Sequence, residues 1–227
     1  GCDPENGGAD CTPGEMAAHD LFFWNKQVQQ ILPNGQSQVQ FNGGKLPPSN
    51  EIEFLKRYCG SKNIVYLNSP PRLEKFAISL ARRLEPLDNA ELLAVCKDIS
   101  YFLHKDYGLL DCIQRGVIYH QRSVPGVVRL YIENLYSTIP EIKYVVSSST
   151  LLEGVNIPAD KLFLLECKKG RGNLTASQFK NLVGRICRFS ELFDPEKGSL
   201  AMLEPEIYIV ASRYMAVNAN IEKFIKD

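Results

Sequence analysis

The chain has 227 residues, and its 26 lysine and arginine residues balance 26 aspartate and glutamate residues, so its formal charge is zero. Hydrophobic residues make up 44% and charged residues 23% of the sequence, as in soluble globular proteins. This composition excludes a coiled coil, a collagen-like repeat and a charged disordered tail. No apolar run approaches the ~18 residues that span a bilayer. Zero net charge disfavours general coating of nucleic acid, though not one local basic stripe.

The seven cysteines are scattered along the chain and odd in number. Most lie within or beside apolar stretches, which is typical of buried free thiols in a reducing compartment. Cys2 and Cys11, with His19 further on, match no spacing of zinc ligands, so no metal site is predicted. No signal peptide is visible, and we expect a cytoplasmic, intracellular protein.

The first 50 residues differ in composition from the rest. Residues 1–20 are dense in glycine, proline and acidic groups, which predicts an irregular lead-in. Residues 21–46 hold short apolar runs separated by turn residues, which favours short strands and a β-hairpin about Asn34-Gly35. We therefore expect residues 1–50 to be an irregular, β-rich extension or linker, and residues 51–227 to be the main domain.

From residue 51 onward, strand-like and helix-like segments alternate. Short apolar runs predict strands at residues 63–68, 116–119, 144–147, 162–165 and 207–211. Helical spacing of apolar residues predicts helices at residues 73–84, 89–103, 125–135 and 218–226. The alternation indicates an α/β fold, with a mainly parallel sheet flanked by helices. In such sheets, ligands bind in the loops beyond the carboxyl ends of the strands.

Several helix starts carry recognisable signals. Asp88 or Asn89 can cap the helix that follows them, and Pro125 can open the next one. Thr175 and Gln178 have the spacing of a capping box, which predicts a further helix running to about Arg185.

That last helix ends in the segment NLVGRICR, residues 181–188. Arg185 and Arg188 are three residues apart, so both guanidinium groups can reach one anionic target from the same helical face. Guanidinium matches phosphate in charge and in bidentate geometry, and Gly184 would let a ligand approach closely. The alternative is a pair of solvated arginines, which are favourable at a helix carboxyl end in any case.

A second polar segment, SSSTLLEGVNIPA at residues 147–159, directly follows a predicted buried strand. Hydroxyl and backbone N–H groups at such a turn can form a phosphate-binding rim. Gly154 permits a tight turn, and Asn156 can hydrogen-bond a sugar hydroxyl. The alternative is an ordinary loop of polar turn residues.

Taken together, these segments resemble the second RecA-like domain of superfamily 2 helicases, most closely the Ski-like, DEAD/DEAH-type branch. Residues 63–84 look like motif IV and its helix, and residues 116–136 look like the G-V-x-x-H-H stretch of that branch. Residues 147–159 are similar to motif V, and residues 181–188 to motif VI, Q-x-x-G-R-x-x-R. The resemblance implies a RecA-like sheet of the P-loop NTPase type.

The sequence departs from the family pattern at a few positions. Gln121 stands where a second histidine is usual, Asn181 replaces the glutamine of motif VI, and Ile186-Cys187 replaces Ala-Gly.

In the family, two RecA-like domains close around ATP, and nucleic acid lies across both. The resemblance implies that Arg185 and Arg188 reach the β- and γ-phosphates, with Arg188 as the arginine finger. It also implies two further sets of contacts. Those near the nucleotide would come from Gly154, Asn156, Asn181 and Gly184. Those to nucleic acid would come from His120, Ser148, Ser149 and Thr150.

A local basic concentration lies between motifs V and VI. It comprises Lys168, Lys169, Arg171 and Lys180 together with the two motif VI arginines. If Lys168 and Lys169 line a strand path, their contacts are to phosphate, so binding is independent of sequence and strongly salt-dependent. The alternative is a solvated charged loop.

Neither a P-loop, G-x-x-x-x-G-K-[ST], nor a D-E-x-H or D-E-x-D box occurs in the sequence. We therefore expect the cofactor, ATP with Mg²⁺, to bind between this domain and an N-terminal RecA-like domain of a longer parent chain, which holds the metal. The expected partners are that domain and DNA or RNA, with no membrane.

The leading hypothesis is thus the C-terminal motor domain of an ATP-dependent helicase or translocase. A non-hydrolysing, helicase-like module that binds nucleic acid or a protein is the alternative, which the departures at Asn181 and Ile186-Cys187 keep open. A third hypothesis, a Rossmann-like enzyme using Cys187 or His120, fits poorly because no pairing of nucleophile and base is readable.

Overall fold

The computed structural model describes residues 50–104, 107–121, 123–148, 157, 159–169, 172–175, 177–179, 182–183, 206–210 and 212–215. The predicted β-rich extension and the predicted closing helix at residues 218–226 lie outside these residues. The boundary predicted at residue 50 therefore stays a prediction.

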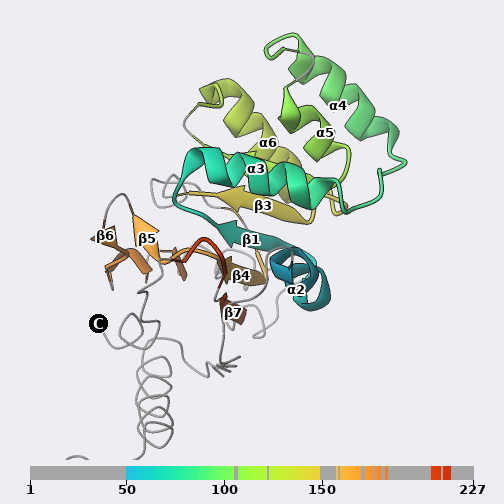
Figure 1. The fold of residues 1–227 in the computed structure, drawn as a ribbon. Helices are drawn as coiled ribbons and strands as arrows, with labels where there is room; N and C mark the ends of the chain where they lie inside the picture. Colours follow the sequence, from blue (N-terminus) through green and yellow to red (C-terminus); the bar gives the residue numbers. More distant parts are fainter. Residues whose placement is uncertain are drawn as a thin grey trace, which may run out of the picture.

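A five-stranded parallel sheet forms the centre of the described structure (Figure 1). Its strands are β1 (Asn63–Tyr66), β2 (Val117–His120), β3 (Tyr144–Ser147), β4 (Lys161–Leu164) and β7 (Glu206–Ile209). They lie in the order β2-β3-β1-β4-β7, and every neighbouring pair is parallel. The predicted α/β fold with a mainly parallel sheet is confirmed, and β3 has the predicted bounds.

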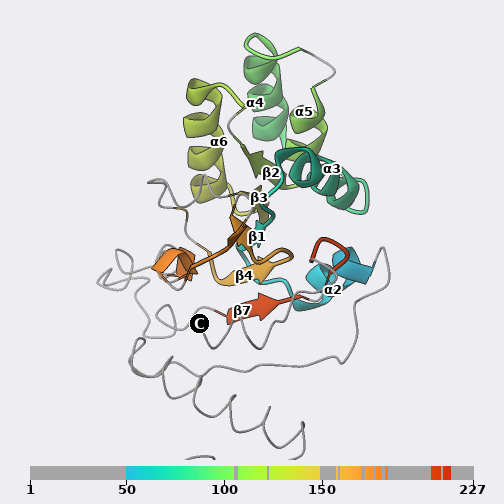
Figure 2. The ribbon, with the colours of Figure 1, turned by 60° about the vertical axis from the view of Figure 1, so that its left-hand side comes forward.

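Helices connect these strands and cover both faces of the sheet. The described ones are α2 (Asn50–Tyr58), α3 (Pro70–Ala81), α4 (Ala90–Ser100), α5 (Gly108–Ile113) and α6 (Gly126–Thr138). Figure 2 shows α2 and α3 on one side of the sheet and α6 on the other, as right-handed crossovers require. Among the described helices, none is long and apolar enough to cross a membrane.

The helix starts follow the signals in the sequence. Asn89 caps α4, because its side chain accepts hydrogen bonds from the backbone N–H groups of Glu91, at 2.9 Å, and Leu92, at 3.3 Å. Pro125 occupies the cap position of α6. Thr175 and Gln178 form the predicted capping box, with reciprocal bonds of 3.1 Å and 3.3 Å between backbone N–H and side-chain oxygen.

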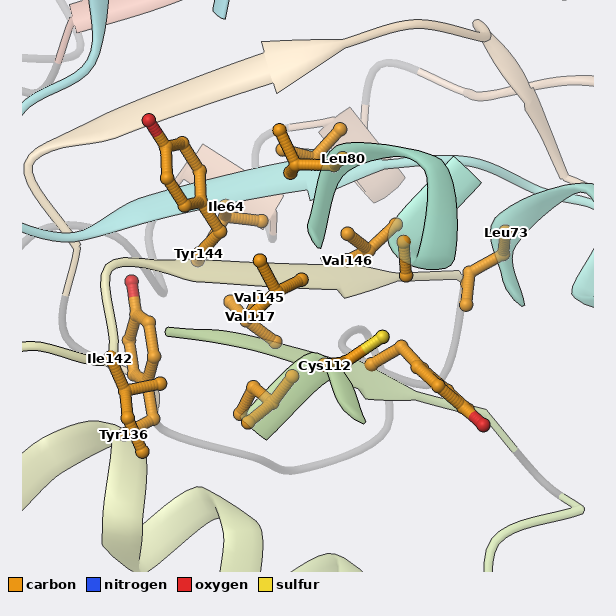
Figure 3. Close-up of a cluster of buried hydrophobic side chains, with 14 of the residues drawn as sticks. Ile64, Leu73, Leu80, Cys112, Val117, Tyr136, Ile142, Tyr144, Val145 and Val146 are labelled. Atoms are coloured by element: carbon orange, nitrogen blue, oxygen red, sulfur yellow. The ribbon is translucent and has the colours of Figure 1, made fainter. Parts of the chain in front are cut away.

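The core lies between the sheet and its helices (Figure 3). Val145 and Val146, neighbours on β3, are both fully buried, since a strand between two helical layers faces apolar side chains on either side. Leu73 and Leu80 reach the core from α3, and Cys112 reaches it from α5. This shared core fixes the strand ends relative to one another.

The amino edge, where the five strands begin, is closed by Lys62. Its ammonium group is buried and donates hydrogen bonds to the backbone carbonyls of Tyr136, Ile139, at 2.7 Å, and Ile142, at 2.8 Å. It thereby satisfies carbonyl groups at and beyond the carboxyl end of α6, where a positive charge also suits the helix dipole. The backbone N–H of Lys62 in turn donates to the Asp160 carboxylate, at 2.9 Å.

Candidate functional site at the carboxyl ends of the strands

The carboxyl edge, where the strands end, brings together segments that are far apart in sequence. Ser147 is the ladder partner of both Tyr66 and His120, so the ends of β1, β2 and β3 are level with one another. Leu164 and Ile209 continue the same edge on β4 and β7. This is the edge at which open parallel sheets bind ligands.

Many of the predicted site residues lie outside the described residues. These are Arg185, Arg188, Gly154, Asn156, Asn181, Gly184, Ser149 and Thr150. Their predicted roles stay predictions. His120, Ser148 and Lys168 are described with their side chains, whereas Lys169 is described only as part of a strand.

The described residues show where the segment predicted as motif V starts. Ser148 follows β3 directly at the carboxyl edge and is only 4% exposed. The hydroxyl of Ser147 donates to the carbonyl of His120, at 3.3 Å, and the carbonyl of Ser147 accepts from the backbone N–H of Leu67, at 2.9 Å. The segment predicted as motif V thus begins between the ends of β1 and β2.

His120, the last residue of β2, is buried, with only 1% of its surface exposed. Its Nε2 lies 2.5 Å from Oε1 of Glu133, a residue of α6. Burial lowers the pKa of the imidazole, and the Glu133 carboxylate partly offsets this effect by favouring the protonated form. In this structure the His120 side chain therefore faces a carboxylate beneath the edge, and its predicted contact with nucleic acid stays untested.

The neighbours of His120 are held from the opposite face of the sheet. Glu74 of α3 accepts hydrogen bonds from the Tyr119 hydroxyl, at 3.3 Å, and from the Gln121 amide, at 3.2 Å. Side chains alternate between the two faces of a strand, so His120 points toward α6 while Tyr119 and Gln121 point toward α3. Two glutamates therefore hold the end of β2, one from each helical layer.

In the middle of the edge, a buried carboxylate links β1 to β4. Glu166 is 4% exposed, and its Oε2 accepts the backbone N–H of Asn68, at 3.2 Å. The Tyr66 hydroxyl donates to the carbonyl of Lys168, at 2.7 Å. Burial, followed by the charge of Glu166, raises the pKa of Tyr66, so this hydroxyl stays protonated and able to donate.

A small antiparallel ribbon follows β4. It is formed by β5 (Lys168–Lys169) and β6 (Gly172–Asn173), with Lys168 opposite Asn173. Lys168 is half-buried, whereas Gly172 and Asn173 are exposed. The predicted loop between motifs V and VI is thus partly a β-ribbon, and it carries two of the predicted basic residues at the carboxyl edge (Figure 1).

At the far end of the edge, Glu51 of α2 is fully buried. Its Oε1 accepts the backbone N–H of Arg213, at 3.0 Å, and lies 3.8 Å from Nε of the same arginine. Arg213 follows β7, so this contact ties the helix before β1 to the segment after the last described strand. Within the part of the chain that the structure describes, Oε2 of Glu51 has no hydrogen-bond partner.

These four glutamates, of which Glu51 and Glu166 are buried, were not predicted from the sequence. Glu133 offered a partial signal, because it borders the buried face of α6 that includes Ile132 and Tyr136. Glu51, Glu74 and Glu166 carry no comparable signal, since their partners lie far away in sequence.

The described cysteines fit the prediction of free thiols, and burial raises the pKa of the Cys167 thiol to about 12.

No protein-family model matches the chain. It is 28% identical over 174 residues to a DNA polymerase theta of Caenorhabditis elegans, across 70% of this chain and 11% of that protein. It is 24% identical over 140 residues to the ATP-dependent DNA helicase Hel308 of Methanocella arvoryzae, across 57% of this chain and 19% of the relative.

It is also 32% identical over 108 residues to the Helicase POLQ-like protein of Drosophila melanogaster, across 47% of this chain and 10% of the relative. The chain therefore spans between 10% and 19% of the length of these curated relatives. The similarities support the resemblance to superfamily 2 helicases, at low identity and over part of the chain.

Proposed function

We propose that the chain is the C-terminal RecA-like motor domain of an ATP-dependent nucleic-acid helicase or translocase. The observation that carries the proposal is the arrangement of the carboxyl edge. Ser148, which directly follows β3, and the ribbon after β4 lie at one edge of a parallel sheet, and the capping box that opens the next helix follows the ribbon. The similarity to one protein named as an ATP-dependent DNA helicase and to another named as a helicase supports the same function.

In this proposal, the helix opened by Thr175 and Gln178 carries two arginines toward the phosphates of ATP. Arg188 serves as the finger that stabilises charge in the transition state, and Arg185 binds beside it. The nucleotide is further contacted by Gly154, Asn156, Asn181 and Gly184. Bound ATP with Mg²⁺ would supply the free energy of phosphoryl transfer, and the metal would be held by a first RecA-like domain.

Nucleic acid would run along the same edge. Ser148, Ser149 and Thr150 would contact the backbone, and Lys168 and Lys169 would contact phosphates from the ribbon. Contacts of this kind position a strand without reading its sequence, so affinity should fall steeply with salt. We propose DNA as the nucleic acid, because the relatives named as helicases include an ATP-dependent DNA helicase. The narrower assignment to the Ski-like branch stays a prediction from the motifs, and none of the three relatives above carries that name.

A second candidate is a helicase-like module that binds nucleic acid or a protein without hydrolysis. The observation that favours it is the departure from motif VI at Asn181 and Ile186-Cys187. The two candidates differ in whether Arg188 has a catalytic effect.

The test is DNA-stimulated ATP hydrolysis by the full-length protein that carries this sequence. We expect Arg188→Ala to lower the stimulated rate by about 10³-fold or more, as for other arginine fingers. Arg83→Ala, which removes an exposed arginine paired with Glu53, is the matched control and should leave the rate unchanged. Unchanged hydrolysis in Arg188→Ala would refute the finger. Absence of hydrolysis with intact DNA binding would favour the second candidate.

A further inference from the structure

The contact between His120 and Glu133 joins the end of a central strand to a helix on one face of the sheet. The carboxylate accepts hydrogen bonds only, so the imidazole must donate its Nε2 proton across the 2.5 Å separation. This bond fixes both the tautomer and the orientation of the ring. Because His120 is buried, its side chain cannot turn toward water to find another donor or acceptor.

His120 is also connected to the start of the segment predicted as motif V. Ser147 is its ladder partner on β3, and the Ser147 hydroxyl donates to the His120 carbonyl, at 3.3 Å. Ser148, the first residue of that segment predicted to contact nucleic acid, follows directly. The residue whose ring binds Glu133 is therefore in direct backbone contact with the first residue of this segment.

The charged groups around the imidazole come from α6. Glu133 favours the protonated ring through its hydrogen bond and its charge, whereas Arg129 disfavours it. Nε of Arg129 is buried and has no hydrogen-bond partner among the described residues. On the opposite face, Glu74 binds the side chains of Tyr119 and Gln121. Glu133 is thus the carboxylate bound to the His120 ring.

We propose that Glu133 is a positioning residue of the nucleic-acid site: through the His120 imidazole it sets the carboxyl end of β2, and with it the start of the segment after Ser147. Glu133 itself does not touch the nucleic acid. The inference rests on the proposed function and deepens it, because it names a residue of α6 that affects nucleic-acid binding only through its contact with His120.

Two conservative variants separate geometry from charge. Glu133→Asp keeps the charge but withdraws the carboxylate by one methylene, so the bond to Nε2 is lost. Glu133→Gln keeps an acceptor oxygen at the same reach but removes the charge. Glu85→Asp and Glu85→Gln are the matched controls, because Glu85 is exposed.

The first readout is the affinity of the full-length protein that carries this sequence for a short single-stranded oligodeoxynucleotide at pH 7.5. We expect Glu133→Asp to weaken binding by about tenfold, which corresponds to roughly 1.4 kcal/mol. The affinity of Glu133→Gln should stay within about twofold of that of the unchanged protein, because this variant keeps the hydrogen bond to Nε2 of His120. A Glu133→Asp variant that binds as well as Glu85→Asp would overturn the proposal.

The second readout is the titration of the His120 imidazole by NMR, which is assignable because the chain has three histidines. Glu133→Gln should lower the pKa of His120 further, since the protonated ring loses its counter-charge. A titration that is unchanged in Glu133→Gln also overturns the proposal. If the unchanged chain binds no oligonucleotide, the proposed function fails, whereas normal binding that is insensitive to Glu133→Asp refutes this inference alone.

Discussion

The two edges of the sheet differ in their buried charged side chains, which are a lysine at the amino edge and two glutamates, Glu51 and Glu166, at the carboxyl edge. At the amino edge, a buried lysine donates to backbone carbonyls, and backbone bonds tie the loops together, as between Lys143 N–H and the Gly116 carbonyl, at 3.0 Å. At the carboxyl edge, four glutamates, three from helices and one from the segment after β4, bind side chains or backbone at or beyond the strand ends. The contacts at the amino edge thus serve stability, whereas the carboxyl edge carries Ser148 and the ribbon, for which nucleic-acid binding is proposed.

The largest expected effect is the loss of the closure at the amino edge. Lys62→Met keeps most of the side-chain volume but removes the ammonium donor from three carbonyl groups. The carbonyl of Ile139 still accepts the Ile142 N–H, whereas those of Tyr136 and Ile142 lose the donor that Lys62 provides. Each unsatisfied buried acceptor costs about 1–3 kcal/mol, so we expect a loss of about 3 kcal/mol or more in the free energy of unfolding. Urea denaturation measures it, with Lys75→Met on the exposed side of α3 as control. A loss below about 1 kcal/mol would contradict the role of Lys62.

A second change at the amino edge acts through the backbone. Gly116 precedes β2 with φ of +74°, and a Cβ added there would lie 2.5 Å from the carbonyl oxygen of Glu141. We expect Gly116→Ala to destabilise the fold by about 2 kcal/mol. Gly172→Ala in the ribbon is the control, since a Cβ there meets nothing within 4 Å. Equal melting temperatures for the two variants would show that the backbone at Gly116 and Glu141 can move apart to accept a Cβ without loss of stability.

At the carboxyl edge, the capping box is expected to have a smaller effect on stability and a larger one on function. Thr175→Ala removes the acceptor for the Gln178 N–H and should cost about 1 kcal/mol, whereas Thr175→Ser keeps the hydroxyl. Because this helix is proposed to carry Arg185 and Arg188, stimulated ATP hydrolysis should fall in Thr175→Ala. Unfolding in urea and the rate of ATP hydrolysis are measured on the same variants. An unchanged hydrolysis rate in Thr175→Ala would show that the capping box does not affect the proposed ATP site.

The smallest expected effect is a dependence of stability on pH. Burial lowers the pKa of His120 below the value of about 6.5 in the unfolded chain. The unfolded state then binds more protons between these two values, so stability is complete above pH ~6.5 and falls as the pH drops toward the folded pKa. Across this pH range, the free energy of unfolding should change less with pH in His120→Gln than in the unchanged chain. The same pH dependence in both proteins would mean that His120 does not contribute.

The sequence predicted the parts of the fold that rest on local signals. The apolar run at residues 144–147 became β3, Asn89 caps α4, and Thr175 pairs with Gln178. Three short described elements, α5, β5 and β6, had no such signal. Helix α5 has only six residues, too few for a helical period to be recognised, and each strand of the ribbon has two.

The position of a candidate site residue was predictable where the residue directly follows a predicted strand, and not where it depends on distant partners. Ser148 and Lys168 lie at the carboxyl edge, as the order of strands and motifs led us to expect. The buried carboxylate of Glu166, by contrast, accepts a hydrogen bond from the backbone N–H of Asn68, 98 residues away. Spacing along the chain does not contain that information.

The central claim is that nucleic acid binds at the carboxyl edge and not at the amino edge. The most direct measurement is NMR chemical-shift perturbation of the 227-residue chain by a short single-stranded oligodeoxynucleotide at low salt. We predict that the perturbed backbone signals gather at Ser147, Ser148 and residues 166–175, while those of Lys62, Gly116 and Asp160 stay unchanged. Perturbation centred on the amino edge, or spread evenly over both edges, would contradict the claim.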